Sequence, residues 1–169
     1  MSDYKPSELK RAAAQGDVEA VKELLAKGHD PNAADAMGGP ALHSAAINGH
    51  VAVVELLLNH GANPNARATR NITALHWAAQ EGHPAIVKML LAHGAAVNVP
   101  NEPGKQTPLH LAVINGSAPV VALLLEHGAD VSARTDGGGT ALSLAKTAEV
   151  THLLRARAAE AKRWWRFWR

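Results

Sequence analysis

Histidine is the side chain in this sequence with the clearest capacity for chemistry, and the chain contains ten. Because histidine titrates near neutral pH and is a common zinc ligand, a cluster of them could serve acid–base catalysis or hold a metal. Eight instead recur at matching offsets along the chain: His43, His76, His110, His50, His83, His60, His93 and His127. Such a series favours a framework role, in which each ring bonds backbone or the hydroxyl of Thr73 or Thr107. We therefore expect no metal site, no cofactor and no catalytic histidine.

Other catalytic patterns are weak. The run Gly137-Gly138-Gly139 lacks the lysine and the following hydroxyl of a phosphate-binding loop. Ser44 and Ser143 fall within expected helices and not on the sharp turn that presents a serine nucleophile. The sequence predicts a protein that is not an enzyme, and catalysis stays a remote alternative.

The recurring histidines belong to a phrase that occurs three times, at spacings of 33 and then 34 residues. The copies read Ala41-Leu42-His43-Ser44-Ala45-Ala46, Ala74-Leu75-His76-Trp77-Ala78-Ala79 and Pro108-Leu109-His110-Leu111-Ala112. Each copy continues into an aliphatic run and ends on His-Gly-Ala, at residues 60–62, 93–95 and 127–129. A fixed period of this length is the signature of a stacked solenoid.

This unit resembles the ankyrin repeat. The threonine-proline-leucine-histidine motif of that family is whole at residues 107–110 and partial at residues 73–76, and Gly39-Pro40 replaces threonine-proline in the preceding copy. The resemblance implies an all-α, ankyrin-type solenoid of stacked antiparallel helix pairs with projecting β-hairpin or finger loops.

The two ends of the chain look like degenerate copies, as expected for terminal repeats that have a neighbour on one side only. In the first copy, polar Lys10 stands where histidine would be. We predict one ankyrin-like domain over residues 1–156, followed by a basic aromatic tail over residues 157–169. The domain divides into units at about 6–38, 39–71, 72–105 and 106–138, with a truncated unit at 139–156.

Within a unit, the residue types assign a role to each helix. Alanine at positions 41, 45 and 46 keeps the first helix of a pair slim, whereas Val54, Leu57 and Leu58 give the second helix a bulky stripe at helical spacing. Gly49, Gly82 and Gly116 stand where the first helix must end, and glycine tolerates the positive φ that this turn requires.

Composition and charge limit the classes of partner. The start of the chain lacks the apolar core of a secretory signal, and no run approaches the ~20 apolar residues that span a bilayer. With no cysteine there is no indication of an oxidising compartment, so we expect a cytoplasmic location. Residues 1–154 hold eleven Lys and Arg against fourteen Asp and Glu, whereas residues 155–169 hold six cations and one acid. Because the body is slightly acidic, we expect no nucleic acid partner.

Positions that change from copy to copy are free to contact a partner. The resemblance places them on one concave surface, formed by the finger tips and by the exposed sides of the first helices. The predicted partner-binding residues are Met37, Ile47, Asn48, Thr69, Arg70, Ile72, Trp77, Gln80, Glu81, Asn101, Lys105, Gln106, Ile114, Asn115 and Asp136. Ile47, Ile72 and Ile114 stand out as apolar residues at slots expected to be exposed.

Two of these features have alternative interpretations. Trp77 either anchors a partner or packs between neighbouring first helices. The third finger, residues 98–106, is one residue longer than its siblings and carries two prolines. That length and stiffness serve recognition, or they are a neutral insertion at a loop tip.

The tail carries three of the four tryptophans, and its predicted contact residues are Trp164, Trp165, Phe167 and Trp168. At 100° per residue, these four occupy one arc of a helix, with the cations on the remainder. The alternatives are a cap on the last unit, insertion into an anionic membrane surface, docking on a partner or a second copy, or no ordered structure. We expect burial of the aromatic face against protein, either the last unit or another molecule.

The sequence as a whole predicts a non-enzymatic scaffold or adaptor that binds a protein partner of unknown identity through the concave surface. The alternative is a peripheral membrane adaptor anchored by the tail, with self-association through the tail as a further route.

Overall fold

The computed structural model describes residues 7–34 and 38–167, with side chains as far as Glu160. Met37 and Trp168 therefore lie outside the described residues, as do the side chains of Trp164, Trp165 and Phe167. Within the described part of the chain, every regular element is a helix, and β pairing is confined to one isolated bridge between Arg134 and Thr140.

Helix pairs follow one another along the chain. The first helices of the pairs are α1 (Glu8–Gln15), α3 (Ala41–Ile47), α5 (Ala74–Glu81), α7 (Pro108–Asn115) and α9 (Ala141–Leu144). The second helices are α2 (Val18–Ala26), α4 (Val51–Asn59), α6 (Pro84–Ala92), α8 (Ala118–Glu126) and α10 (Ala148–Phe167), and a short 3₁₀ helix, η1 (Thr69–Asn71), precedes α5.

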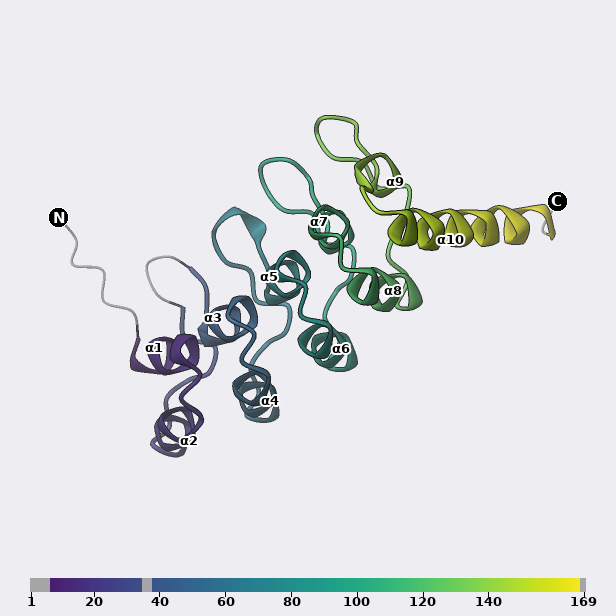
Figure 1. Cartoon of the computed structure of the whole chain (residues 1–169). Helices are drawn as coiled ribbons and strands as arrows, with labels where there is room; N and C mark the ends of the chain where they lie inside the picture. The colour runs from purple at the N-terminus through teal and green to yellow at the C-terminus, as the bar shows by residue number, and fades with distance from the viewer. Residues whose placement is uncertain (1–6, 35–37, 168–169) are drawn as a thin grey trace.

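The pairs stack into two layers. Figure 1 shows α1, α3, α5, α7 and α9 side by side in one layer and α2, α4, α6 and α8 in the other. Each pair contacts the pairs before and after it, so the molecule is an elongated stack, and the predicted all-α solenoid is confirmed.

Small residues line the contacts between first helices. Ala45 and Ala46 in α3 and Ala78 and Ala79 in α5 have no exposed surface. The second helices bury larger side chains, such as Val54 and Leu57 in α4. One continuous apolar core therefore runs the length of the stack, as the distribution of alanine and leucine predicts.

Glycine ends the first helices because neighbouring units approach closely there. Gly49 has a φ of 76°, and a Cβ built on it would lie 2.8 Å from the imidazole of His83. That ring also lies 3.4 Å from the carbonyl oxygen of Ile47, and His50 repeats the arrangement against the carbonyl oxygen of Ala14 at 3.0 Å. Each of these two histidines thus contacts the preceding unit at the end of its first helix.

Asparagine side chains join the second layer from unit to unit. The Asn65 amide donates to the carbonyl oxygen of Gly94 at 2.9 Å and accepts from the Ala96 N–H at 2.7 Å. Asn32 and Asn98 make the same pair of bonds with the pairs that follow them. Each bond satisfies a backbone group in the turn that follows a second helix.

The motif histidines close the first turns of their helices. His76 Nδ1 accepts from the backbone N–H of Thr73 at 3.1 Å, and His110 Nδ1 accepts from that of Thr107 at 3.2 Å. The threonine hydroxyls lie 2.9 Å from the same nitrogens. The framework role expected for these rings is confirmed.

The alignment of the second unit was wrong by one residue. Pro40, and not Gly39, holds the N-cap position that Thr73 and Thr107 hold in the later units. Because proline has neither a backbone N–H nor a hydroxyl, His43 Nδ1 is buried without a hydrogen-bond partner. The second unit therefore lacks the Nδ1 bond that the third and fourth units have, whereas in the third unit it is His76 Nε2 that is buried without a partner.

The C-terminal end of the stack is open. Leu142 lies in α9 and is 40% exposed, although Leu42, Leu75 and Leu109 at the equivalent positions are completely buried. Among the described residues, no further first helix follows α9 to cover it.

Replacing Ala45 or Ala78 with leucine tests the close contact between first helices. Neither site has space for three more carbon atoms, so we expect a loss of about 1 to 3 kcal/mol in the free energy of unfolding. The exposed Gln80 offers a control, since Gln80→Ala removes no buried contact. Equal melting temperatures for the leucine variants and the control would contradict this account.

Replacing Pro40 with threonine tests the missing Nδ1 bond at His43. The N–H and hydroxyl of threonine would satisfy a buried acceptor, worth about 1 to 3 kcal/mol, against a loss of about 0.4 to 1 kcal/mol in proline rigidity. We expect the free energy of unfolding, measured by urea denaturation, to rise by roughly 1 kcal/mol. Pro40→Ala restores only the N–H, so its free energy of unfolding should lie between those of the wild type and Pro40→Thr. A Pro40→Thr variant less stable than the wild type would show that the unpaired Nδ1 of His43 does not destabilise the fold.

Candidate functional site

An open groove of about 710 Å³ lies between the first helices and the finger loops. Here the second finger loop is residues 65–72, the third is residues 98–106 and the fourth is residues 132–139. The groove is lined by Lys10, Gly39, His43, Ser44, Ile47, Ala68, Thr69, Arg70, Ile72, Trp77, Gln80, Asn101, Glu102, Pro103 and Gln106. Parts of α1, α3 and α5, of the second and third finger loops, and Gly39 before α3 thus form one surface.

Apolar side chains form a continuous part of this lining. Ile47 on α3, Ile72 at the end of the second finger loop and Trp77 on α5 are each half-buried, so they present surface to the groove while they pack against its wall. Pro103 adds an exposed ring from the third finger loop. Partly exposed apolar surface beside polar groups is typical of a protein contact site.

Charged groups flank the apolar lining. Lys10 comes from α1 and Arg70 from the second finger loop, and Glu102 is the one acidic residue among those lining the groove. Arg70 is exposed, and within the described residues its guanidinium has no ion pair. The groove can therefore accept a negatively charged group beside an apolar one.

The backbone around Arg70 is fixed in an unusual conformation. Arg70 and Asn71 have φ values of 61° and 60°, in the left-handed region that residues other than glycine seldom adopt. Asn71 compensates with two bonds, since its amide donates to the carbonyl oxygen of Pro100 at 2.7 Å and its oxygen accepts from Arg67 at 2.9 Å. Such strain is held where the surroundings over-determine it, and it often marks a functional position.

The third finger loop is bonded to both of its neighbours. The backbone N–H of Glu102 donates to the carbonyl oxygen of Arg70 at 2.8 Å. On the other side, Gly104 and Asp136 exchange two hydrogen bonds of 3.0 Å, and Lys105 forms an ion pair of 3.3 Å with the Asp136 carboxylate. The longer third loop thus joins the second and fourth loops, and Figure 1 shows these loops projecting on the same side of the stack.

The structure brings together about half of the predicted partner-binding residues. Those that line the groove are Ile47, Thr69, Arg70, Ile72, Trp77, Gln80, Asn101 and Gln106. Those outside it are Asn48, Glu81, Lys105, Ile114, Asn115 and Asp136, of which Ile114 is 39% exposed on α7.

Asn101 is buried, although it was expected at an exposed finger tip. Its side-chain oxygen accepts from the N–H of Gln106 at 2.8 Å, and its own N–H donates to the carbonyl oxygen of Gln106 at 2.9 Å. The side chain closes the third finger loop from inside, because the extra residue creates a turn whose backbone needs a partner.

Sequence reasoning missed several residues of the groove, among them Lys10, Glu102 and Pro103. Lys10 carried a signal, because it replaces the motif histidine in the first unit. The two loop residues carried none, because their direction depends on the turn that Asn101 closes.

The buried histidines are held neutral by their surroundings. Burial lowers the pKa of His76 to about 4, although the backbone carbonyls of Gln106 and Val99 act in the opposite direction. Burial also lowers the pKa of His43 and of His110, against the carbonyls of Ile72 and Ala133 respectively. A neutral ring whose Nδ1 accepts from the backbone carries its proton on Nε2, which matches the distance of 3.1 Å from His110 Nε2 to the Ala133 carbonyl oxygen.

Neither a metal site nor a membrane-spanning helix is present among the described residues. Across that part of the chain, no three His, Cys, Asp or Glu side chains converge as metal ligands. Nor does any described helix combine the length and apolar character needed to cross a membrane.

Comparison with known protein families gives two matches. A family model described as ankyrin repeats (3 copies) matches residues 9–101, and a second, described as ankyrin repeats (many copies), matches residues 101–145. No curated protein matches the chain with significance.

The low pKa of His76 predicts how stability changes with pH. The folded chain keeps this ring neutral down to about pH 4, whereas the unfolded chain protonates it below about 6.5. Between these values the unfolded chain binds more protons, so the free energy of unfolding falls as the pH falls. At about 1.4 kcal/mol per unit of pKa difference, the loss is on the order of 3 kcal/mol.

His76→Gln tests this dependence, because glutamine keeps an acceptor for the Thr73 N–H but does not titrate. In urea denaturation, the free energy of unfolding of this variant should fall less between pH 7 and pH 4 than that of the wild type. Part of the fall should remain because His43 and His110 are still present. Gln80→Ala, which removes no titratable group, should follow the wild-type profile. Parallel profiles for all three proteins would mean that His76 does not couple folding to protons.

Proposed function

Because the chain belongs to the ankyrin repeat family, whose members are generally protein–protein interaction modules, we propose that it acts as a scaffold or adaptor that binds a protein partner through the groove. The observation that carries this proposal is the combination of a half-buried apolar lining with a cationic flank on a fixed backbone. The proposed module works by binding and has no catalytic role.

The groove also suggests the chemistry of the partner segment. An aliphatic or aromatic side chain of the partner would cover Ile47, Ile72 and Trp77 and remove their exposed surface from water. A neighbouring carboxylate would meet the guanidinium of Arg70, which forms strong paired hydrogen bonds with carboxylates. We therefore propose a segment in which an acidic residue stands beside an apolar one.

The fixed fingers support this assignment. Loops that are already ordered lose little conformational freedom on binding, so more of the contact energy appears as affinity. Bonds on both sides of the third finger loop, to Arg70 and to Asp136, provide such order. The structure thus supports the recognition role of that loop more than the neutral alternative.

A displayed library of random peptides, selected against the full chain, tests the proposed groove. We expect enrichment of peptides that combine an acidic residue with a large apolar one. Arg70→Glu should weaken them roughly 30-fold or more, the loss expected for about 2 kcal/mol at a buried arginine contact. Exchanging the acidic residue of the peptide for lysine should restore binding to the Arg70→Glu variant but not to the wild type.

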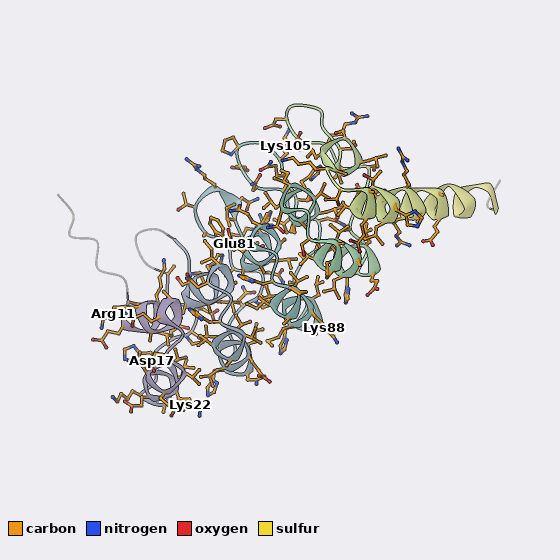
Figure 2. The ribbon with its side chains drawn as sticks, viewed as in Figure 1. Arg11, Asp17, Lys22, Glu81, Lys88 and Lys105 are labelled. Carbon is orange, nitrogen blue, oxygen red and sulfur yellow. The ribbon has the colours of Figure 1, made fainter. Side chains whose placement is uncertain are left out.

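A matched control makes the same charge change on the other side of the stack. Lys88 on α6 is exposed and lies away from the finger loops (Figure 2), so Lys88→Glu should leave peptide affinity unchanged. Ile72→Ser should reduce affinity without reversing the charge preference, and circular dichroism should verify the fold of each variant. Selected peptides that bind wild type and Arg70→Glu equally would move the site away from the groove.

A further inference from the structure

The last helix is much longer than its counterparts. α10 has 20 residues, whereas α2, α4, α6 and α8 have nine each. Val150 and Leu154 are almost completely buried and fix its first turns against α8 and α9. Figure 1 shows α10 from the side, running past the stack, while the other helices are seen nearly end-on.

The remainder of α10 extends away from the last unit. Thirteen residues separate Leu154 from Phe167, which at 1.5 Å per residue amounts to about 20 Å. A continuous helix of this length does not fold back over α9, so the backbone disfavours the interpretation of the tail as a cap on the last unit.

The anchored turns fix the rotation of the helix. At 100° per residue, Val150, Leu153 and Leu154 lie on one arc, and positions 161, 164, 165 and 167 fall on the same arc further along. The face that docks α10 on the stack is thus continued, in sequence, by alanine, two tryptophans and phenylalanine.

Two charged residues interrupt this apolar arc, and they pair with each other. The Nη1 atom of Arg157 lies 3.2 Å from Oε2 of Glu160, one turn along the helix. The arc therefore has no net charge. The other four cations of α10 beyond Leu154, which are Arg155, Lys162, Arg163 and Arg166, occupy positions on the opposite arc.

We propose that the distal part of α10, residues 155–167, lies along the surface of an anionic lipid bilayer. An interfacial helix has this distribution, with aromatic residues at the boundary with the acyl chains and Arg or Lys toward the headgroups. Four cations on one arc match a surface of negative charge. Pairing with a second copy through the apolar arc would leave these cations facing water, whereas anionic headgroups pair with them.

This surface is independent of the groove. The groove is formed by α1, α3, α5 and their finger loops, and the tail leaves from the opposite end of the stack. A bilayer at the tail would therefore leave the groove open to its partner, and the chain would hold that partner at the membrane surface.

Sedimentation of the full chain with vesicles tests the proposal. We expect binding to phosphatidylcholine vesicles that contain phosphatidylserine, little binding to phosphatidylcholine alone, and a decrease as salt is added. Arg163→Glu with Arg166→Glu removes the charge match, and Trp164→Ala with Trp165→Ala removes aromatic surface. Each double variant should lower the fraction bound at least roughly tenfold, since every cation near an anionic surface contributes several-fold.

The matched control is Arg11→Glu with Lys22→Glu, which makes the same change of charge on exposed residues of α1 and α2 (Figure 2) and should bind like the wild type. Absence of binding to anionic vesicles, or equal binding by the tail variants and the control, would overturn the proposal. The proposal would also be overturned if light scattering showed a dimer that the tail substitutions dissociate while no variant binds vesicles. Binding of single-stranded DNA instead of vesicles would overturn it too. Circular dichroism and melting curves would verify that both tail variants remain folded.

Discussion

Close approach of neighbouring first helices is the constraint on which the rest of the structure depends. Ala45, Ala46, Ala78 and Ala79 leave no space between these helices, and the first helices contact one another more extensively than the second helices do. A stack that packs more tightly in one layer than in the other curves toward the tighter layer. The finger loops stand beside that layer, so they converge, and the groove between them and α1, α3 and α5 results from the size of an alanine side chain.

The sequence predicted those features that the packing of first helices imposes on every unit. Alanine, leucine, glycine and histidine recur at matching offsets because each unit solves the same packing problem, so the helix pairs and the roles of His76 and His110 could be read directly. Single exceptions were harder. The position of Pro40 was misassigned because a Gly-Pro pair looks like a Thr-Pro pair one residue later, and only the helix start shows which residue is the N-cap.

The candidate site could be predicted only in part. Ile47, Ile72 and Trp77 were found because an apolar residue at a variable position is conspicuous. Asn101 was misjudged and Glu102 was missed for one reason: both belong to a turn with an extra residue, and no repeated pattern fixes the direction of its side chains. The same limit applies to Ile114, whose variable slot lies one helix beyond the groove.

The exposed Leu142 indicates which end of the stack unfolds first. A solenoid gains its free energy unit by unit from the interfaces between neighbours, and the pair that begins with the four-residue α9 has such an interface on one side only. At the other end, charged residues such as Glu8 and Arg11 face water, and α1 buries its leucine. Partial opening should therefore start at α9 and α10 and detach the tail, while the helices that form the groove remain intact.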